Sequence, residues 1–426
     1  MPLKGEHVAG AAPAETGTLG PDGRQASGGA GRGTGGEVVG PFGRPLPAPV
    51  FYGLALASVG GPLGLAALFV PATLLGASSS SGLIVLVGAL LFGFPVLAWY
   101  RYASRVASSG GLYTFVEAAA GVWPARLHGA AWLVSYFLYL PSTMAYVLWD
   151  VLPVAFRGIG PYRAALEVVV PVAMVAGLVA WRLGLLAVTA AVGAAQVLLV
   201  GVLAGLEIAR AGGVASSFGL HVPAASGAQY AASVSLLFIC GTLPLYFGAE
   251  LRRPTAVTSR ALPVSIGIGA ACALAGAVSL SHFRTALSTA VPGWGIATSL
   301  GGRALGVAVV VGTALSALTL VLLEYVALTR LLHAMLSVAP RRAELGVGAA
   351  FVLSAALSLF GPNAAYSELL TPSLAALYIS QVVVFAVYPR FARPRGHWRA
   401  RDVLVAAVSC GLMVYGLYNL FRSGTG

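Results

Sequence analysis

The chain has 426 residues, of which 58% are hydrophobic and only 9% are charged. Soluble domains have roughly a quarter of their residues charged, so this composition excludes a soluble enzyme, a nucleic-acid binder and a disordered chain. It is typical of an all-α polytopic membrane protein. The net charge of +12 does not indicate nucleic-acid binding, because the basic residues lie mostly in short segments between apolar runs.

Residues 1–49 differ in kind from the rest of the chain. They contain 13 Gly and 7 Pro and few large apolar residues. Such a segment buries too little apolar surface to order itself, and it lacks the apolar core of a cleaved signal peptide. We expect a disordered cytoplasmic tail here.

From residue 50 onward, long apolar runs alternate with short polar breaks. Most runs approach the roughly 20 residues that cross a hydrocarbon layer of about 30 Å. We expect eleven transmembrane helices, at residues 50–75, 82–102, 127–150, 163–181, 184–208, 228–249, 261–283, 303–330, 345–361, 369–389 and 401–421.

The basic residues between these runs predict the orientation of the chain. With a cytoplasmic N-terminus, 19 of the 25 basic residues lie on the cytoplasmic side and 6 lie on the other side. Cytoplasmic loops of membrane proteins carry an excess of Lys and Arg. The sequence therefore predicts a multi-pass protein of the cell membrane, in contact with the lipid bilayer, with its C-terminus outside.

The spans divide into two halves of equal length. Residues 50–210 hold five spans, residues 226–389 hold five more, and residues 401–421 form an additional one. Because five is odd, the second set must run opposite to the first. This is the arrangement of an inverted-topology repeat, which is common in secondary transporters.

The first span of each half carries helix-breaking residues at matching positions, within residues 58–64 and within residues 240–244. Gly and Pro destabilise helix interiors by about 1 and 3 kcal/mol, and paired interruptions of this kind indicate a transporter's substrate site. A simple kink in each helix is the alternative. We expect discontinuous helices 1 and 6, with substrate held by Ser58, Val59, Gly60, Gly61 and Gly64 in the first and by Cys240, Gly241 and Thr242 in the second.

Interrupted helices suit a zwitterionic ligand. An opened helix N-terminus presents N–H groups that attract a carboxylate, and the carbonyls of the opposite half accept hydrogen bonds from an ammonium group. Neither role needs a charged side chain, and charged side chains are rare within the spans.

Three motifs carry a family resemblance. Residues 105–121 contain Gly110-Gly111-Leu112-Tyr113 and end in Gly121; residues 248–254 contain Glu250, then a Leu, two Arg and a Pro, and residues 260–263 read Arg-Ala-Leu-Pro. These motifs, with the Gly-rich break in the first span, resemble the amino acid–polyamine–organocation (APC) superfamily. The chain departs from that family in having Leu251 after Glu250 and Pro62 in the first break, and we expect eleven helices where the family usually has twelve.

The resemblance implies a LeuT-like fold and a permease that carries amino acids or related amines by alternating access, as a symporter or an antiporter. It places the substrate carboxylate on the amides of residues 58–64 and the amine on carbonyls near residues 240–242. In the related fold, hydroxyls of the eighth span form a sodium site with the first span, which points to Thr313 and Ser316. The alternative is that these hydroxyls hydrogen-bond to backbone carbonyls of their own helix.

Further polar and aromatic residues are candidates for the site. Glu324 is the most deeply placed acid and either takes part in proton coupling or pairs with Arg330. Tyr136 and Tyr139 can offer a hydroxyl to a substrate carboxylate, and Phe238 can close over the substrate; ordinary packing is the alternative for these three.

Five residues at the cytoplasmic ends of the spans are candidates for a gate that closes through ion pairs, with solvated loop positions as the alternative. They are Gly110, Gly111, Glu117, Glu250 and Arg252.

The sequence contains no nucleophile–base motif and no helical metal-binding pair of His residues. Cys240, Cys272 and Cys410 have neither metal-site nor disulfide spacing. We therefore expect no enzyme activity, no cofactor or metal other than Na⁺ or H⁺ as a coupling ion, and no obligatory protein partner. A transporter of another small solute, a channel and a membrane-embedded enzyme remain as alternatives.

Overall fold

The computed structural model describes residues 45–278, 280–287, 289–393 and 399–423, and within these ranges all regular secondary structure is helical. The longer helices are α1 (Ala48–Ser58), α4 (Ser81–Ala103), α5 (Leu112–Ala120), α6 (Val122–Tyr146), α8 (Arg163–Ala211), α9 (Ala224–Leu236), α10 (Pro254–Ala277), α11 (Pro292–Leu336), α12 (Pro340–Ser358), α13 (Pro362–Ala386) and α15 (Ala400–Ser423).

Shorter helical pieces complete the structure. They are α2 (Pro62–Gly64), the π-helix η1 (Leu65–Phe69), α3 (Val70–Thr73), η2 (Leu75–Ser80), the π-helix η3 (Val147–Val151), α7 (Leu152–Ala155), η4 (Arg157–Tyr162), η5 (Ala215–Phe218), the 3₁₀-helix η6 (Ile239–Glu250), η7 (Leu280–His282), η8 (Arg284–Ala286) and α14 (Tyr388–Ala392). The predicted tail, residues 1–49, lies outside the described residues up to residue 44, and α1 already begins at Ala48.

Nine helical stretches of the described chain are long and apolar enough to cross a membrane. That number counts α8 once, although the non-helical Trp181 (φ −144°, ψ 45°) interrupts it. A straight helix of its 49 residues would be about 74 Å long, more than twice the hydrocarbon thickness of about 30 Å. Trp181 therefore separates the fourth and fifth predicted spans.

The eighth and ninth predicted spans also correspond to helices of the structure. Within α11, Gly301 and Gly302 leave the helical conformation, so the eighth span begins after them. The ninth span is α12, whose first turns carry Arg341, Arg342 and Glu344. Each of the eleven sequence-predicted spans therefore contains a helix, and the expected all-α polytopic architecture is confirmed.

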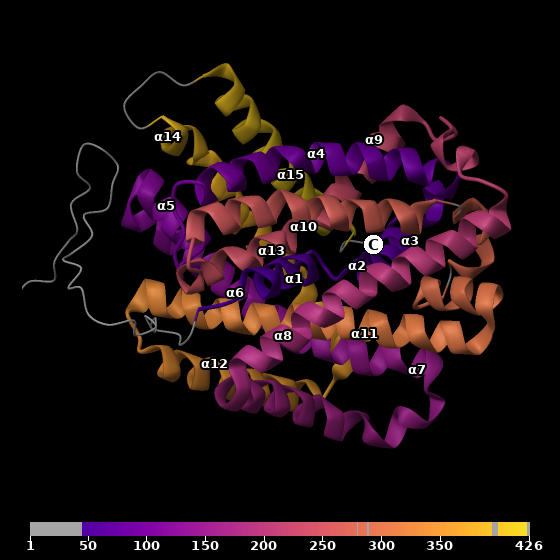
Figure 1. Cartoon of the computed structure of the whole chain (residues 1–426), viewed down its shortest axis with the longest axis horizontal. Coiled ribbons are helices and arrows are strands. Elements are labelled where there is room, and N and C mark those ends of the chain that lie inside the picture. Colours follow the sequence, from indigo (N-terminus) through magenta and orange to yellow (C-terminus); the bar gives the residue numbers. More distant parts are fainter. Residues whose placement is uncertain (1–44, 279, 288, 394–398, 424–426) are drawn as a thin grey trace, which may run out of the picture. The chain divides into compact units, whose positions relative to one another are not determined.

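The first span lies inside the helix bundle. The helix α1 contacts α8, α10, α11 and η6, and it runs through the middle of the described helices (Figure 1). In its most apolar window 89% of the residues are buried, compared with 33% for α8 and for α15. The interruption in this span is therefore surrounded by protein, which is the condition under which non-helical backbone is tolerated at membrane depth.

Small residues let α1 and α8 approach closely. A Cβ atom added to Gly53 would lie 2.5 Å from the Cβ atom of Ala190, and one added to Gly193 would lie 3.2 Å from that of Ala57. Small residues at such interfaces allow close packing of membrane helices. This contact positions the helix that leads into the first interruption.

We predict that Gly53→Val destabilises the protein, because the added side chain overlaps Ala190 of α8. Overpacking of this kind costs about 1–3 kcal/mol. The measurement is the thermal unfolding temperature of the purified protein in detergent. The control is Gly201→Val in α8, where a Cβ atom meets no atom within 4 Å; an equal effect of both variants would contradict the packing argument.

Candidate functional site

The interruption of the first span lies at the residues that the sequence predicted. The helix α1 ends at Ser58 and α2 begins at Pro62. Between them, Gly60 (φ 84°) and Gly61 (φ 69°) adopt positive φ angles, which glycine adopts at little cost. Gly61 also faces α11, because a Cβ atom there would lie 2.5 Å from the Ser316 side chain.

The interruption of the sixth span begins earlier than predicted. We expected it at Cys240–Pro244, but α9 ends at Leu236 and the turn comprises Leu237 and Phe238. The segment from Ile239 to Glu250 is wound as a 3₁₀-helix, and the N–H group of Gly241 donates to the carbonyl of Phe238. Gly241 and Pro244 thus lie within a tightly wound helix instead of an open segment, and 3₁₀ bonding satisfies the N–H group of Gly241.

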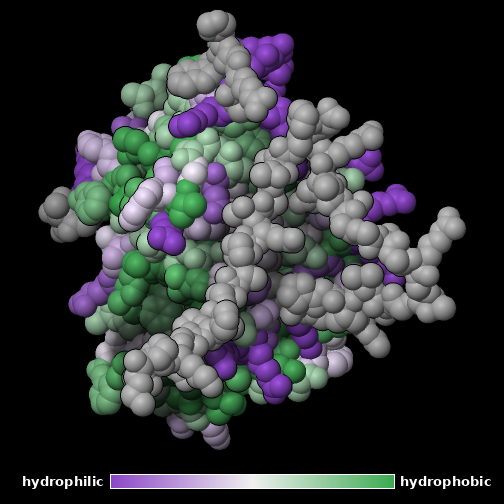
Figure 2. All heavy atoms as spheres, turned by 90° about the vertical axis from the view of Figure 1, so that its left-hand side faces the viewer, coloured by the Kyte–Doolittle hydropathy of each residue, from purple (hydrophilic) through white to green (hydrophobic). Residues whose placement is uncertain are grey.

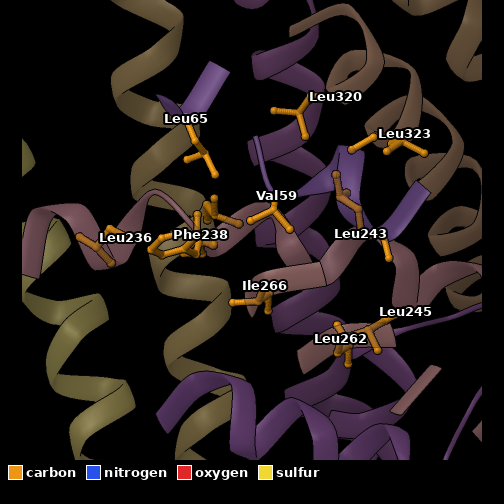
Figure 3. Close-up of a cluster of buried hydrophobic side chains, with 14 of the residues drawn as sticks. Val59, Leu65, Leu236, Phe238, Leu243, Leu245, Leu262, Ile266, Leu320 and Leu323 are labelled. Carbon is orange, nitrogen blue, oxygen red and sulfur yellow. The ribbon is translucent and has the colours of Figure 1, made fainter. Parts of the chain in front are cut away.

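The two interruptions lie side by side. A Cβ atom on Gly241 would be 3.7 Å from the Val59 side chain, and Val59 and Phe238 belong to one cluster of buried apolar side chains (Figure 3). Phe238 is fully buried, and its ring centre lies 5.6 Å from that of Phe92. Phe238 therefore packs into the core beside the turn.

A cavity of about 380 Å³ adjoins both interruptions. Three of the predicted substrate residues line it: Gly60, Tyr139 and Cys240. The predicted coupling residue Glu324 and the predicted aromatic Tyr136 also line it. The other predicted substrate residues do not line the cavity and are buried beside it: Ser58, Val59, Gly61, Gly64, Phe238, Gly241 and Thr242.

The cavity runs along α6, and a different pair of aromatic rings lies at each of its ends. Its lining on this helix extends from Ser135 to Tyr146, and the eleven helical steps between them span about 16 Å. At one end Tyr146 stacks on Tyr366, with ring centres 4.7 Å apart. Beyond the other end the buried rings of Trp132 and Tyr246 pack together, with centres 4.5 Å apart.

Of the cavity-lining residues of α11, Glu324 is the nearest in sequence to Arg330, which binds Glu250, so Glu324 lies toward the end that these rings close. Its side chain is fully buried, and both carboxylate oxygens lack a hydrogen-bond partner among the described residues. The alternative pairing with Arg330 is not formed, because Arg330 binds Glu250 instead, with its Nη2 atom 2.6 Å from the carboxylate. Glu324 is thus an unpaired carboxyl group that lines the cavity.

The hydroxyl of Ser316 joins three helices. It accepts a hydrogen bond from the N–H group of Gly64 at 3.1 Å and donates to the side-chain carbonyl of Gln196 at 2.7 Å. Gln196, in turn, donates to the carbonyl of Gly312 at 3.4 Å. The hydroxyl of Thr313 is buried without a partner in the described structure, so sodium binding by Thr313 and Ser316 stays a prediction.

Glu250 is the centre of a buried ionic cluster, which we call the Glu250 cluster: Glu250, Arg182 and Arg330. The Nε atom of Arg330 donates to Glu250 at 2.7 Å, and Arg182 pairs with the second carboxylate oxygen. The guanidinium of Arg330 lies 5.0 Å from the ring centre of Phe247, a favourable cation–π geometry. The cluster thus links α8, η6 and α11.

The backbone just before α1 is attached to the same cluster. The N–H group of Leu46 donates to the carbonyl of Glu250 at 2.7 Å. The start of the first span and the end of the sixth are therefore bound together at this end of the bundle, which we call the Glu250 end. Figure 2 looks onto this end and shows hydrophilic residues interspersed with hydrophobic ones on its described surface.

The other predicted gate residues have different surroundings. Gly111 (φ 51°) packs against Tyr246, whose ring would lie 2.8 Å from an added Cβ atom, and Gly110 packs against Thr114 and Ala334. Glu117 lies near Tyr113, whose pKa is raised by burial and by that carboxylate. Arg252 is exposed. The structure thus brings Gly110 and Gly111 to the Glu250 end.

Comparisons with solved structures identify the architecture. The crystal structure of MhsT in complex with L-phenylalanine matches with a TM-score of 0.54 and 15% sequence identity, covering 87% of this chain and 98% of MhsT. The manganese transporter of Eremococcus coleocola, in complex with an aromatic bis-isothiourea substituted compound, matches with a TM-score of 0.56 and 13% identity, covering 89% of this chain and 88% of the transporter. The chain has the LeuT-like fold.

The LeuT-like fold confirms the predicted multi-pass, discontinuous-helix architecture. No family model and no curated protein sequence matches the chain. At sequence identities of 13–15% these matches establish the fold alone, so the cargo has to be argued from the cavity.

Sequence reasoning missed three polar residues that the LeuT-like fold brings to the site. Gln196 is an amide within an apolar run, and polar groups inside membrane spans indicate function by default. Its position in the sequence could therefore have identified it as a candidate site residue. Arg182 counted only as a loop charge and Arg330 also as a possible partner of Glu324, and nothing local to them indicated that both would bind Glu250.

We predict that Glu250→Gln loosens the Glu250 end, because two buried guanidinium groups lose their shared carboxylate. Breaking a buried ion pair costs about 3–5 kcal/mol. The measurement is labelling of Cys240 by a membrane-impermeant maleimide applied from the Glu250 end, in a background with Cys272→Ser and Cys410→Ser. We expect faster labelling than in that background alone.

Arg341→Gln is the matched control, because Arg341 is an exposed arginine at the start of α12. Its labelling rate should equal that of the background. A Glu250→Gln rate that also equals the background would contradict a closing role for the cluster.

Proposed function

We propose that this protein is a secondary transporter that moves amino acids or related amines across the membrane by alternating access. The observation that carries the proposal is the cavity beside the two interrupted helices. It is closed by packed rings and the Glu250 cluster at one end. At the other end it is lined by the partly exposed Tyr146 and Tyr366.

The Glu250 cluster supplies the moving part of this cycle. Its three members belong to α8, η6 and α11, and the start of α1 is attached to it through Leu46. Release of these ion pairs would free the ends of both interrupted helices together. The excess of Arg on this side supports a cytoplasmic position for the Glu250 end.

The lining of the cavity supports an organic cargo. The two matching structures are a protein in complex with L-phenylalanine and a manganese transporter, so the fold itself accommodates different cargoes. In this cavity Glu324 and Cys240 are the only lining residues with strong metal-ligand side chains, and most of the others are aromatic or aliphatic. Apolar walls with few polar groups suit a small organic molecule.

Two coupling ions are compatible with these residues. Glu324 is the candidate for binding a proton, and Thr313 with Ser316 is the candidate for binding sodium. Uptake driven by a proton gradient alone or by a sodium gradient alone distinguishes them.

We predict saturable uptake of labelled amino acids or amines into proteoliposomes, with competition by unlabelled substrate. Gly60→Leu should abolish this uptake, because the side chain would enter the cavity from a position with positive φ. Gly302→Leu is the control, since Gly302 has a similar φ of 72° but no atom within 4 Å of an added Cβ atom. Conduction that does not saturate would instead indicate a channel, and unchanged uptake by Gly60→Leu would contradict the site.

A further inference from the structure

The charge of the cavity lining bears on the chemistry of the substrate. The lining contains one acidic residue, Glu324, and no Arg, Lys or His. The Glu324 side chain is fully buried, and its oxygens accept no hydrogen bond from any described residue. An unpaired carboxylate in such surroundings is costly and is stabilised by a cation. The cavity is therefore complementary to a cationic ligand.

The first interruption offers little to a substrate carboxylate. Pro62 has no N–H group, and the N–H groups of Gly61 and Leu65 donate to the carbonyls of Ala57 and Gly61. The N–H group of Gly64 donates to Ser316. Among residues 60–65 the N–H groups of Gly60 and Leu63 lie outside these bonds, and of these two residues only Gly60 lines the cavity. Anion sites at helix ends use several N–H groups at once.

The rest of the lining suits a bulky apolar group. Phe69, Tyr139, Leu320, Leu374 and Tyr378 come from four different segments. Aromatic rings within about 6 Å of an ammonium group also attract it through their π-faces. Glu324 lies toward the closed end, so a ligand bound to it would extend its apolar part along α6 toward Tyr146.

We propose that the substrate is an amine without a carboxylate group, a monocation with a large apolar substituent whose ammonium group binds Glu324. This inference rests on the proposed transport function and narrows its substrate class. It replaces the carboxylate subsite expected at residues 58–64 with a single cation subsite on α11.

Matched ligands test the proposal in the full-length protein in nanodiscs. Phenethylamine, L-phenylalanine and 3-phenylpropanoate share a phenyl group and carry a cation, a zwitterion and an anion, and 3-methylbutylamine with L-leucine forms an aliphatic pair. Isothermal titration should show each amine binding about tenfold or more tightly than its amino acid, because the extra carboxylate is left without donors. The anion 3-phenylpropanoate should bind weakest.

Variants test the role of Glu324. Glu324→Gln should weaken binding of phenethylamine by about a hundredfold, as expected when one partner of a buried charge pair is removed. Glu368→Gln is the control, because Glu368 is an exposed acid on α13 outside the cavity lining, and it should bind phenethylamine like the parent protein. If Glu324→Gln does not fold, the ligand comparison in the parent protein still decides the substrate class.

The outcomes separate this inference from the proposed function. Tighter binding of L-phenylalanine and L-leucine than of their amines would overturn the inference and leave amino acid transport intact. Unchanged phenethylamine affinity in Glu324→Gln would overturn the role of Glu324. Failure of both amines to bind would overturn the inference, whereas failure of uptake across the whole panel of amines and amino acids would overturn the transport function.

Discussion

The rest of the structure depends on the need to satisfy non-helical backbone deep within a membrane protein. Peptide groups in the hydrocarbon region must be hydrogen-bonded by protein or must line a wet cavity. Here the first span meets this requirement by being enclosed by α8, α10, α11 and η6. Ser316 takes the N–H group of Gly64, so the interruption is anchored to the helix that also carries Glu324.

Two buried acids in this protein have opposite surroundings. Glu250 is bound by two arginines and joins three helices, whereas Glu324 has no partner and lines the cavity. A satisfied charge pair holds elements together, and an unsatisfied buried charge favours the binding of a counter-ion. We therefore propose closure as the role of Glu250 and ligand recognition as the role of Glu324.

The fold and the recognition chemistry come from different parts of the sequence. Structures with only 13–15% identity share the architecture over more than four-fifths of this chain, because apolar spans and paired interruptions can be built from many sequences. The residues that face the cavity are few. Changing them alters the cargo without altering the helices, which is why a shared fold does not name a substrate.

Local chemistry determined much of this protein from sequence alone. Hydropathy located the eleven spans, and the pair Gly60-Gly61 followed by Pro62 located the first interruption, because helix propensity and positive φ are properties of a few neighbouring residues. The sequence also predicts Gly60, Tyr139, Cys240 and Glu324 as candidate site residues, and all four line the cavity.

The tertiary structure alone decided which distant polar groups pair with each other and where the sixth span turns. Arg330 and Glu250 are 80 residues apart, and Gly64 and Ser316 are 252 apart, so no local pattern indicates these bonds. The choice of Glu250 over Glu324 by Arg330 depends on how α11 packs against η6. Likewise, the turn at Leu237–Phe238 is accompanied by burial of Phe238 beside Phe92, and side-chain packing of this kind exists only once the helices are assembled.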